Sequence, residues 1–323
     1  MQPDQQMAFI VGAPRCGTTT LASLLRQHPQ VCFSAVKEPH FFPRFELDAL
    51  SDEELRALVQ RDYLDRFFAS CTPSHKVLAE GSVSYLYAPE AMRAPLRLWP
   101  NSKFIIALRD PLSMIPSLHA RLLMTGDETI TDFAEAWART PERAAGRAIP
   151  RSAADARWLR YDESGRFGTH VQRFFDVVGR ERCHVVLFDD LTRDPHGTYA
   201  ALCGFLGLKP WHATDFKVRR RHFAYRWGWL QRLLKRPPKA VQSMLAGEKF
   251  NQREGQQARK GAVMRVRKRL LDWNKVPARR QPLDPVVRQQ IADHLRGEVV
   301  TLSRLLGRDL SHWLGGVPEA TGR

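Results

Sequence analysis

The chain has 323 residues, of which 43% are hydrophobic and 10% are aromatic. These shares are typical of a folded globular protein and exclude a disordered one. The formal net charge of +16 comes from residues 216–323, since residues 1–215 are close to neutral. Such a charge favours binding to an anion, which could be a nucleotide, an acidic glycan, a lipid surface or a nucleic acid.

The first residues and the cysteines bear on the cellular compartment. The sequence does not open with a basic segment and a long apolar stretch, and no window approaches the ~18 apolar residues of a spanning helix. We therefore expect a cytoplasmic protein. The cysteines are scattered, without CxxC spacing, so we expect reduced and mostly buried thiols rather than a disulfide framework or a zinc site. They are Cys16, Cys32, Cys71, Cys183 and Cys203.

Short apolar segments alternate with helical patterns along the first two thirds of the chain. The helical pattern over 51–70 begins with a capping box, Ser51 to Glu54. The alternation indicates an α/β fold, with a mainly parallel sheet flanked by helices. The predicted strands are 8–12, 31–34, 77–80, 103–109 and 184–188, and the predicted helices are 18–27, 51–70, 111–125, 165–178 and 195–206.

The sequence changes in character after Trp211. Residues 217–280 are rich in Arg, Lys and Gln, and we interpret them as a basic lid or insertion segment with one short amphipathic helix over 227–234. Residues 282–307 recover an apolar period of 3.6 residues. We expect residues 282–314 to be a helical part that packs back on the domain, and we predict a single domain over residues 1–323.

Residues 12–20, GAPRCGTTT, lie where the first strand meets the first helix. Unpaired amides and the helix dipole at such a junction favour an anion, so we predict a phosphate or sulfate site. The two glycines have the Walker A spacing, but Thr18 stands in place of the lysine and Arg15 is the nearest cation. An ordinary ATP-binding loop is therefore disfavoured, and a purely structural glycine turn is the alternative.

Residues 103–117, KFIIALRDPLSMIPS, place Arg109 at the carboxyl end of a strand and Ser117 on the next helix. Ligands of open α/β sheets bind just outside such strand ends. A guanidinium and a hydroxyl suit a phosphate monoester. Taken alone, the RDP string could equally be a turn with a salt bridge.

Residues 37–42, KEPHFF, follow the second predicted strand. We expect the paired phenylalanines to anchor this loop, while Glu38 and His40 point into a cleft. Either side chain could then remove a proton from an acceptor. For this string alone, a surface loop without catalytic function is the alternative.

Together these motifs resemble the sulfotransferases that use 3′-phosphoadenosine 5′-phosphosulfate (PAPS), in particular the branch of heparan-sulfate-type and bacterial carbohydrate enzymes. The matching strings cover nearly the whole chain. They are PRCGTT, KEPHFF, EGSVSY, LRDPLSMIPS, GRFGTHV and LLGRDLSHWL, in this order. The resemblance implies a P-loop-like sheet, PAPS as co-substrate without a metal, and a carbohydrate, glycolipid or small metabolite as acceptor.

The resemblance also implies roles for particular residues. Glu38 is the expected base, with His40 as the competing base, and Arg15 stabilises the charge that develops during transfer. Arg109 and Ser117 are expected to hold the 3′-phosphate. The 5′-phosphosulfate is assigned to Arg15, Cys16, Gly17, Thr18, Thr19 and Thr20, and a basic lid over the phosphates to Arg259, Lys260 and Gly261.

This sequence departs from the family pattern in two places. Many relatives carry a lysine right after the glutamate that matches Glu80, but here Gly81 follows. Arg15 also replaces the commoner lysine of the first loop. The cation expected at the reacting sulfuryl group is therefore missing, and Lys37 or His40 could supply its charge.

Two other functions compete with sulfuryl transfer. Residues 184–190, HVVLFDD, imitate the Walker B strand of a P-loop kinase, with Asp189 or Asp190 as magnesium ligand, although both could simply cap the next helix. The basic and aromatic segment 219–236 could bind nucleic acid. We expect no nucleic-acid partner, but peripheral contact with an anionic or membrane-associated substrate fits the charge.

Overall fold

The structure is a computed structural model, which describes residues 5–211, 223–227, 234, 262–277 and 282–315. The chain divides into two compact units, and two of the division points lie within helices α5 (Pro111–Thr125) and α15 (Pro285–Leu306). The prediction of one domain stays a prediction. The sheet unit consists of Met1–Met114, Arg166–Arg219 and Leu295–Arg323, and the second unit of Ile115–Gly165 and Arg220–His294.

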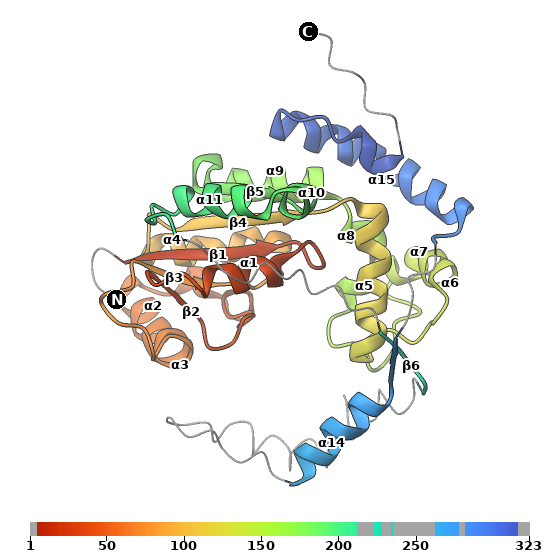
Figure 1. Ribbon diagram of the computed structural model, residues 1–323, viewed down its shortest axis with the longest axis horizontal. Helices are drawn as coiled ribbons and strands as arrows, with labels where there is room; N and C mark the ends of the chain where they lie inside the picture. Colours follow the sequence, from red (N-terminus) through yellow and green to blue (C-terminus); the bar gives the residue numbers. More distant parts are fainter. Residues whose placement is uncertain (1–4, 212–222, 228–233, 235–261, 278–281, 316–323) are drawn as a thin grey trace. The chain divides into compact units, whose positions relative to one another are not determined.

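The sheet unit is built on five parallel strands in the order β2-β3-β1-β4-β5. Figure 1 shows them stacked in this order, from β5 at the top to β2 at the bottom. The predicted α/β fold with a parallel sheet is confirmed, and each predicted strand is correct to within two residues. The strands are β1 (Gln6–Gly12), β2 (Val31–Phe33), β3 (Val77–Glu80), β4 (Lys103–Leu108) and β5 (Cys183–Leu187).

Helices connect the strands of the sheet unit. The predicted helix over 51–70 begins at Asp52, and Ser51 and Glu54 form both hydrogen bonds of the capping box. The α-helices are α1 (Thr18–Leu25), α2 (Asp52–Val59), α3 (Asp65–Phe67), α4 (Arg93–Leu98), α9 (Phe167–Val178), α10 (Phe188–Arg193) and α11 (Pro195–Phe205). Shorter turns are η1 (Phe42–Arg44), η2 (Leu47–Ala49), η3 (Gln60–Leu64), η4 (Tyr85–Tyr87), η5 (Pro89–Met92), η7 (Arg180–Arg182) and η8 (Ser311–Leu314).

The core of the sheet unit contains aromatic side chains stacked on one face of the central strands. Phe9 of β1 lies opposite Phe104 of β4, and their ring centroids are 5.6 Å apart. Phe174 of α9 packs on Phe104, and Phe42 of η1 packs on Phe9. Leu21 of α1 is fully buried as well. Burial from both sides explains why the central strands are nearly continuous apolar runs without alternation.

The second unit contains a buried ion pair. Arg143 lies 2.8 Å from Glu128, and neither side chain is exposed. The hydroxyl of Tyr161 donates a hydrogen bond of 2.8 Å to Glu128, and the amides of Thr129 and Ile130 donate to the same carboxylate, so the buried charge is well satisfied. The elements here are α6 (Phe133–Ala138), α7 (Thr140–Ala144), η6 (Ala156–Leu159), α8 (Tyr161–Ser164), β6 (Phe223–Tyr225), α14 (Ala262–Trp273) and β7 (Lys275–Pro277).

The structure corrects our expectation for two cysteines. Cys32 of β2 and Cys71, in the turn after α3, form a disulfide, with their Cα atoms 5.6 Å apart. The other three cysteines are buried free thiols, as expected. The expectation of reduced thiols was wrong for this pair because the cysteines are 39 positions apart in the sequence, and nothing between them indicates that they come together.

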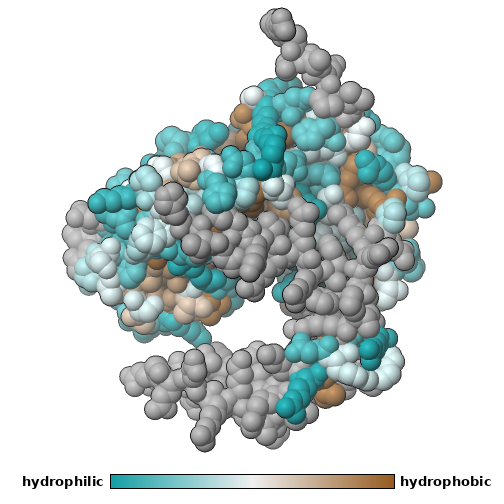
Figure 2. Space-filling view, viewed as in Figure 1, coloured by the Kyte–Doolittle hydropathy of each residue, from teal (hydrophilic) through white to brown (hydrophobic). Residues whose placement is uncertain are grey.

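Figure 2 shows that the described residues on the viewed face are mostly hydrophilic, with hydrophobic residues in limited areas. No helix among the described residues is long and apolar enough to cross a membrane. Most of the predicted amphipathic helix over 227–234 lies outside the described residues, as does most of the basic segment 219–236.

Candidate functional site

The carboxyl edge of the sheet brings several predicted site residues to one side of the sheet unit. All five strands are parallel, so the segments that follow them leave from the same edge. Arg15 follows β1, Glu38 follows β2 and Arg109 follows β4. Since β1 pairs directly with β4, the loops that carry Arg15 and Arg109 are neighbours.

Residues 13–17 form a tight loop that leads into the first turn of α1, residues 18–20, and we call residues 13–20 the anion loop. The amide of Ala13 donates to the carbonyl of Ala107 at 2.6 Å, which ties the loop to β4. Gly17 is the N-cap of α1, and no side chain in the described part of the chain caps this helix. The first amides of α1 therefore lack the side-chain acceptor that often satisfies them, which is the arrangement that favours an anion.

Position 17 requires glycine for two reasons. Its φ of 91° is a conformation that side chains disfavour. A Cβ atom here would also lie 3.0 Å from side-chain carbons of both Leu191 and Phe188. Arg15 adopts a left-handed conformation too, with φ of 65°, and its side chain is exposed. The loop therefore turns sharply and presents Arg15 to solvent.

The side chain of Cys16 maintains the shape of the anion loop. It is fully buried, and its Sγ donates to the carbonyl of Pro14 at 3.4 Å. Burial raises the pKa of the thiol, so it stays protonated at neutral pH. Of the three threonines that follow Gly17, Thr18 is buried, Thr19 is exposed and Thr20 is partly exposed.

Arg109 and the anion loop share one aromatic neighbour, Phe188, the first residue after β5. The guanidinium of Arg109 lies 4.5 Å from the ring centroid. The same ring lies close to Gly17, because a Cβ atom at position 17 would be 3.0 Å from it. Sequence reasoning missed Phe188, although the rule that selected Arg109, a position just beyond a strand end, applies to it equally.

Ser117 lies within α5, where its side chain is 6% exposed. It belongs to the second unit, whereas Arg109 belongs to the sheet unit. Their pairing therefore stays a prediction. Arg259, Lys260 and Gly261 lie outside the described residues.

The KEPHFF loop is anchored as expected. Phe41 and Phe42 are 5% and 1% exposed, and both rings pack on Tyr63. The backbone is also tied to the segment after β3, because the amide of His40 donates to the Ser82 hydroxyl at 2.8 Å. This anchoring leaves the polar side chains of the loop to line the carboxyl edge.

Glu38 has a cationic partner on one oxygen and an imidazole on the other. Lys37 Nζ donates to Glu38 Oε1 at 2.5 Å, and His40 Nε2 lies 3.4 Å from Oε2. Nδ1 of His40 is 2.7 Å from the hydroxyl of Ser84. Partial burial alone would raise the pKa of Glu38, but the His40 hydrogen bond and the Lys37 charge outweigh it and lower the pKa to about 2. Glu38 is therefore an ionised proton acceptor at neutral pH.

Glu80, the last residue of β3, is a second carboxyl group near this loop. It is completely buried. The Tyr63 hydroxyl lies 3.5 Å from its Oε1, and its Oε2 has no hydrogen-bond partner in the part of the chain that the structure describes. Burial raises the pKa of Glu80 to about 7, although Tyr85 and Ser82 favour the ionised form. Sequence reasoning missed this group as a titrating site.

The aspartates of the competing Walker B interpretation have partners within the protein. Asp190 forms ion pairs with Arg193 and Arg308, and Asp189 accepts a hydrogen bond of 2.8 Å from the indole of Trp313. Both aspartates lie in the first turn of α10 rather than capping it. They connect α10 to the chain after α15, which accounts for them without a metal ion.

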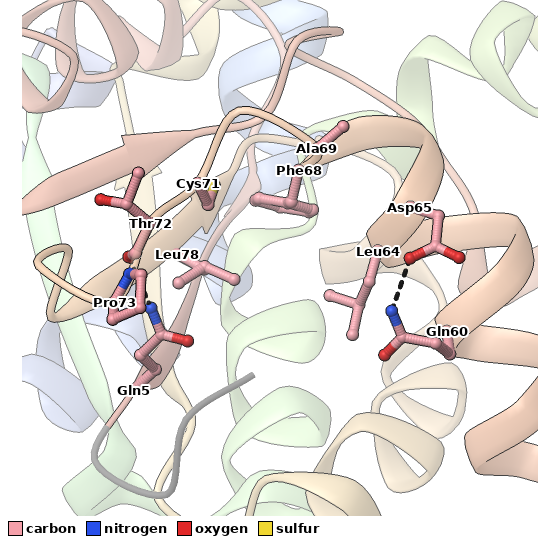
Figure 3. A pocket seen from close by; sticks show the side chains of 10 residues that line it. All are labelled: Gln5, Gln60, Leu64, Asp65, Phe68, Ala69, Cys71, Thr72, Pro73 and Leu78. Atoms are coloured by element: carbon pink, nitrogen blue, oxygen red, sulfur yellow. Dashed lines mark hydrogen bonds between the residues drawn. The ribbon is translucent and has the colours of Figure 1, made fainter.

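A cavity of about 440 Å³ lies away from these residues. Figure 3 shows its lining, which includes Gln5 before β1, Leu78 near the start of β3, and Cys71. A hydrogen bond of 2.5 Å joins Gln60 and Asp65 across part of the lining. The cavity is thus at the amino end of the strands, and none of its lining residues was a predicted site residue.

Comparison with known proteins places these features in a family. The sequence profile described as "Sulfotransferase family" matches residues 8–77 and 33–213. Human carbohydrate sulfotransferase 15 is 42% identical over 144 residues, with 34% of this chain and 26% of the relative covered. Human heparan sulfate glucosamine 3-O-sulfotransferase 6 is 27% identical over 206 residues, with 62% of this chain and 52% of the relative covered. The chain thus spans at most about half the length of these curated relatives.

A solved structure resembles nearly the whole chain. The crystal structure of a sulfotransferase from Alicyclobacillus acidocaldarius superposes with a TM-score of 0.61 at 25% sequence identity. The match covers 97% of this chain and 99% of that chain. The similarity to this solved structure therefore extends over the fold of nearly the whole chain.

Proposed function

Because this chain belongs to the sulfotransferase family, we propose that it transfers a sulfuryl group from PAPS to a hydroxyl or amine of an acceptor. One observation carries the proposal: an ionised carboxylate, Glu38, shares Lys37 with the anion loop at the carboxyl edge of the sheet. A proton acceptor beside an anion site is what sulfuryl transfer needs.

In this proposal the anion loop binds the 5′-phosphosulfate of PAPS. The amides at the start of α1, the Thr18–Thr20 hydroxyls and the guanidinium of Arg15 supply the donors. Arg109 and Ser117 hold the 3′-phosphate, and the ring of Phe188 fixes the Arg109 guanidinium. Arg259, Lys260 and Gly261 are proposed to cover the phosphates, and the Cys16 side chain to act only through the loop's shape.

Glu38 is the proposed base. It takes the proton of the acceptor while the acceptor oxygen or nitrogen attacks sulfur, and the bridging oxygen leaves with adenosine 3′,5′-bisphosphate (PAP). Negative charge grows on that oxygen, and each preorganised donor at the anion loop contributes about 3 kcal/mol to its stabilisation. The transferred group carries less charge than a phosphoryl group, so the loop cations suffice without a metal.

His40 is better placed to position Glu38 than to replace it. One ring nitrogen faces Glu38 and the other faces Ser84, so both are engaged. We therefore propose that His40 orients the carboxylate toward the acceptor.

The relatives favour a carbohydrate acceptor. The two human proteins are a carbohydrate sulfotransferase and a heparan sulfate glucosamine 3-O-sulfotransferase by name. A glycolipid or a small metabolite is the alternative. Incubation with PAPS labelled with sulfur-35, separately with oligosaccharide, glycolipid and small-molecule fractions, identifies the class by the product that carries the label.

Nucleotide binding tests the proposal without an acceptor. PAP should raise the melting temperature, and ATP with Mg²⁺ should raise it far less, because ATP lacks the 3′-phosphate proposed for Arg109. Equal stabilisation by both nucleotides, lost for ATP in EDTA, would instead support the kinase. Failure of PAP to stabilise the protein, combined with salt-sensitive oligonucleotide binding, would support a nucleic-acid-binding protein.

A further inference from the structure

The side chain of Lys37 joins the two halves of the proposed active site. Its Nζ atom donates to Glu38 Oε1 at 2.5 Å and to Thr18 Oγ1, in the anion loop, at 3.4 Å. The side chain is 18% exposed, so its ammonium is largely withdrawn from water. One cation thus contacts both the donor site and the base.

Gly81 leaves room for the side chain of Lys37, because it has no side chain of its own. A Cβ atom at position 81 would lie 3.7 Å from Lys37 Cε and 3.6 Å from the Lys37 carbonyl oxygen. The amide of Gly81 also donates to that carbonyl at 2.8 Å. The stem of Lys37 therefore runs along the bare backbone after β3, and its ammonium occupies the space beside the anion loop that a side chain from position 81 would approach.

A lysine ammonium can exchange partners at this place with little movement. It has three donor hydrogens and a flexible stem. Its two present acceptors are a carboxylate and a neutral hydroxyl, and the contact with the hydroxyl is the longer one. An anionic sulfuryl group seated on the anion loop would place charged oxygens close to Thr18, where they would compete with Glu38 for the ammonium.

We propose that Lys37 binds the sulfuryl group of PAPS, and that its move from Glu38 to this group couples donor binding to release of the base. The inference rests on the proposed sulfuryl transfer and adds a residue and an order of events to it. Before PAPS binds, Glu38 is held by Lys37. Once Lys37 contacts the sulfuryl oxygens, Glu38 keeps only the His40 contact among those described and becomes a stronger base for the acceptor proton.

Nucleotide affinity tests the first part. PAP differs from PAPS only by the sulfuryl group, so Lys37→Met should weaken PAPS binding by about tenfold to a hundredfold, the range expected for a lost charge-assisted hydrogen bond. PAP binding should change by less than about threefold on the same scale. Calorimetric titration with each nucleotide, without acceptor, gives the ratio of PAPS affinity to PAP affinity for each protein. Lys76→Met is the matched control, because Lys76 directly precedes β3, whereas Lys37 lies beside Gly81 at the carboxyl end of this strand. The control should leave both affinities unchanged.

The outcomes separate the two proposals. If the wild-type protein binds neither nucleotide, the proposed function fails. If it binds both, and a Lys37→Met variant with the circular dichroism spectrum of the wild type binds PAPS and PAP equally weakly, or neither more weakly, the role of Lys37 is overturned while the proposed function stands. A misfolded variant would lose PAP as well, so it cannot imitate the expected result.

The titration of Glu38 tests the second part. Carboxyl ¹³C resonances of glutamate-labelled protein are followed against pH, and Glu38→Gln identifies the signal. PAPS should raise the pKa of Glu38 from about 2 toward the ordinary value, whereas PAP should not. In Lys37→Met the pKa should already be raised without nucleotide. An unchanged Glu38 titration in the PAPS complex would overturn the exchange of partners.

Discussion

The buried carboxyl group of Glu80 should make the stability of the protein fall between acidic and neutral pH. Glu80 is fully buried, and burial raises its pKa to about 7 from the ordinary 4.5. The folded protein therefore binds this proton more tightly than the unfolded chain does. Its contribution is present below pH 4.5 and is lost as the pH rises through about 7.

The size of the effect follows from the two pKa values. A difference of about 2.5 units at about 1.4 kcal/mol per unit corresponds to about 3 kcal/mol over the whole range. Between pH 5.5 and pH 8, the free energy of unfolding should fall by about 2 kcal/mol through this group alone. The lowered pKa of Glu38 acts below pH 4.5, so it does not overlap this window.

Replacement of Glu80 by glutamine should remove this part of the pH dependence. Glu80→Gln keeps the shape of the side chain but cannot ionise, so its urea unfolding midpoint should change less between pH 5.5 and pH 8 than that of the wild type. The free energies of unfolding of the two proteins should diverge by about 2 kcal/mol across this range. Parallel pH profiles, or a Glu80 carboxyl resonance that titrates near 4.5, would refute the reasoning.

Three further predictions concern the site and the disulfide. Glu38→Gln should fold and bind PAP with wild-type affinity but lose nearly all turnover, while His40→Ala keeps measurable turnover; the reverse pattern would make His40 the base. Arg15→Ala should mainly lower kcat, because Arg15 is the residue proposed to meet the developing charge, and Arg109→Ala should mainly weaken PAP binding measured by calorimetry. A loss of affinity alone in both variants would contradict this division. Cys71→Ser should lower the free energy of unfolding by about 3 kcal/mol in non-reducing buffer. In reducing buffer, the variant and the wild type should have the same free energy of unfolding.

The motifs near strand ends could be placed from the sequence because one rule governs them. Ligands of open α/β sheets bind beyond the strand ends, so once β1 and β4 were recognised as apolar runs, Arg15 and Arg109 were each expected at an anion site. The signal that predicted the start of the helix at Asp52 was also local, because its capping box spans only four residues. Local patterns of this kind survive folding because the backbone hydrogen bonds they satisfy are themselves local.

Contacts between distant loops could not be predicted. Lys37 reaches Thr18 only because β2 and β1 flank β3, an order that the sequence does not state. The disulfide of Cys32 with Cys71 depends in the same way on where the turn after α3 lies. Phe188 could have been selected by its position after β5, but nothing in the sequence indicated that its ring would contact the Arg109 guanidinium.

Two carboxyl groups on neighbouring segments differ in charge, and the difference supports Glu38 as the base. Glu38 is 37% exposed and has two polar partners, so it is ionised and an acceptor can reach it. Glu80 is sealed from solvent and lacks a partner for Oε2 among the described residues, so below about pH 7 it holds its proton in a place that no acceptor reaches. Surroundings that separate two pKa values in this way are typical of paired carboxyl groups with different roles. Since Glu80 stays largely neutral below pH 7, it does not compete with Glu38 for Lys37 and His40, and both remain available to the exposed carboxylate.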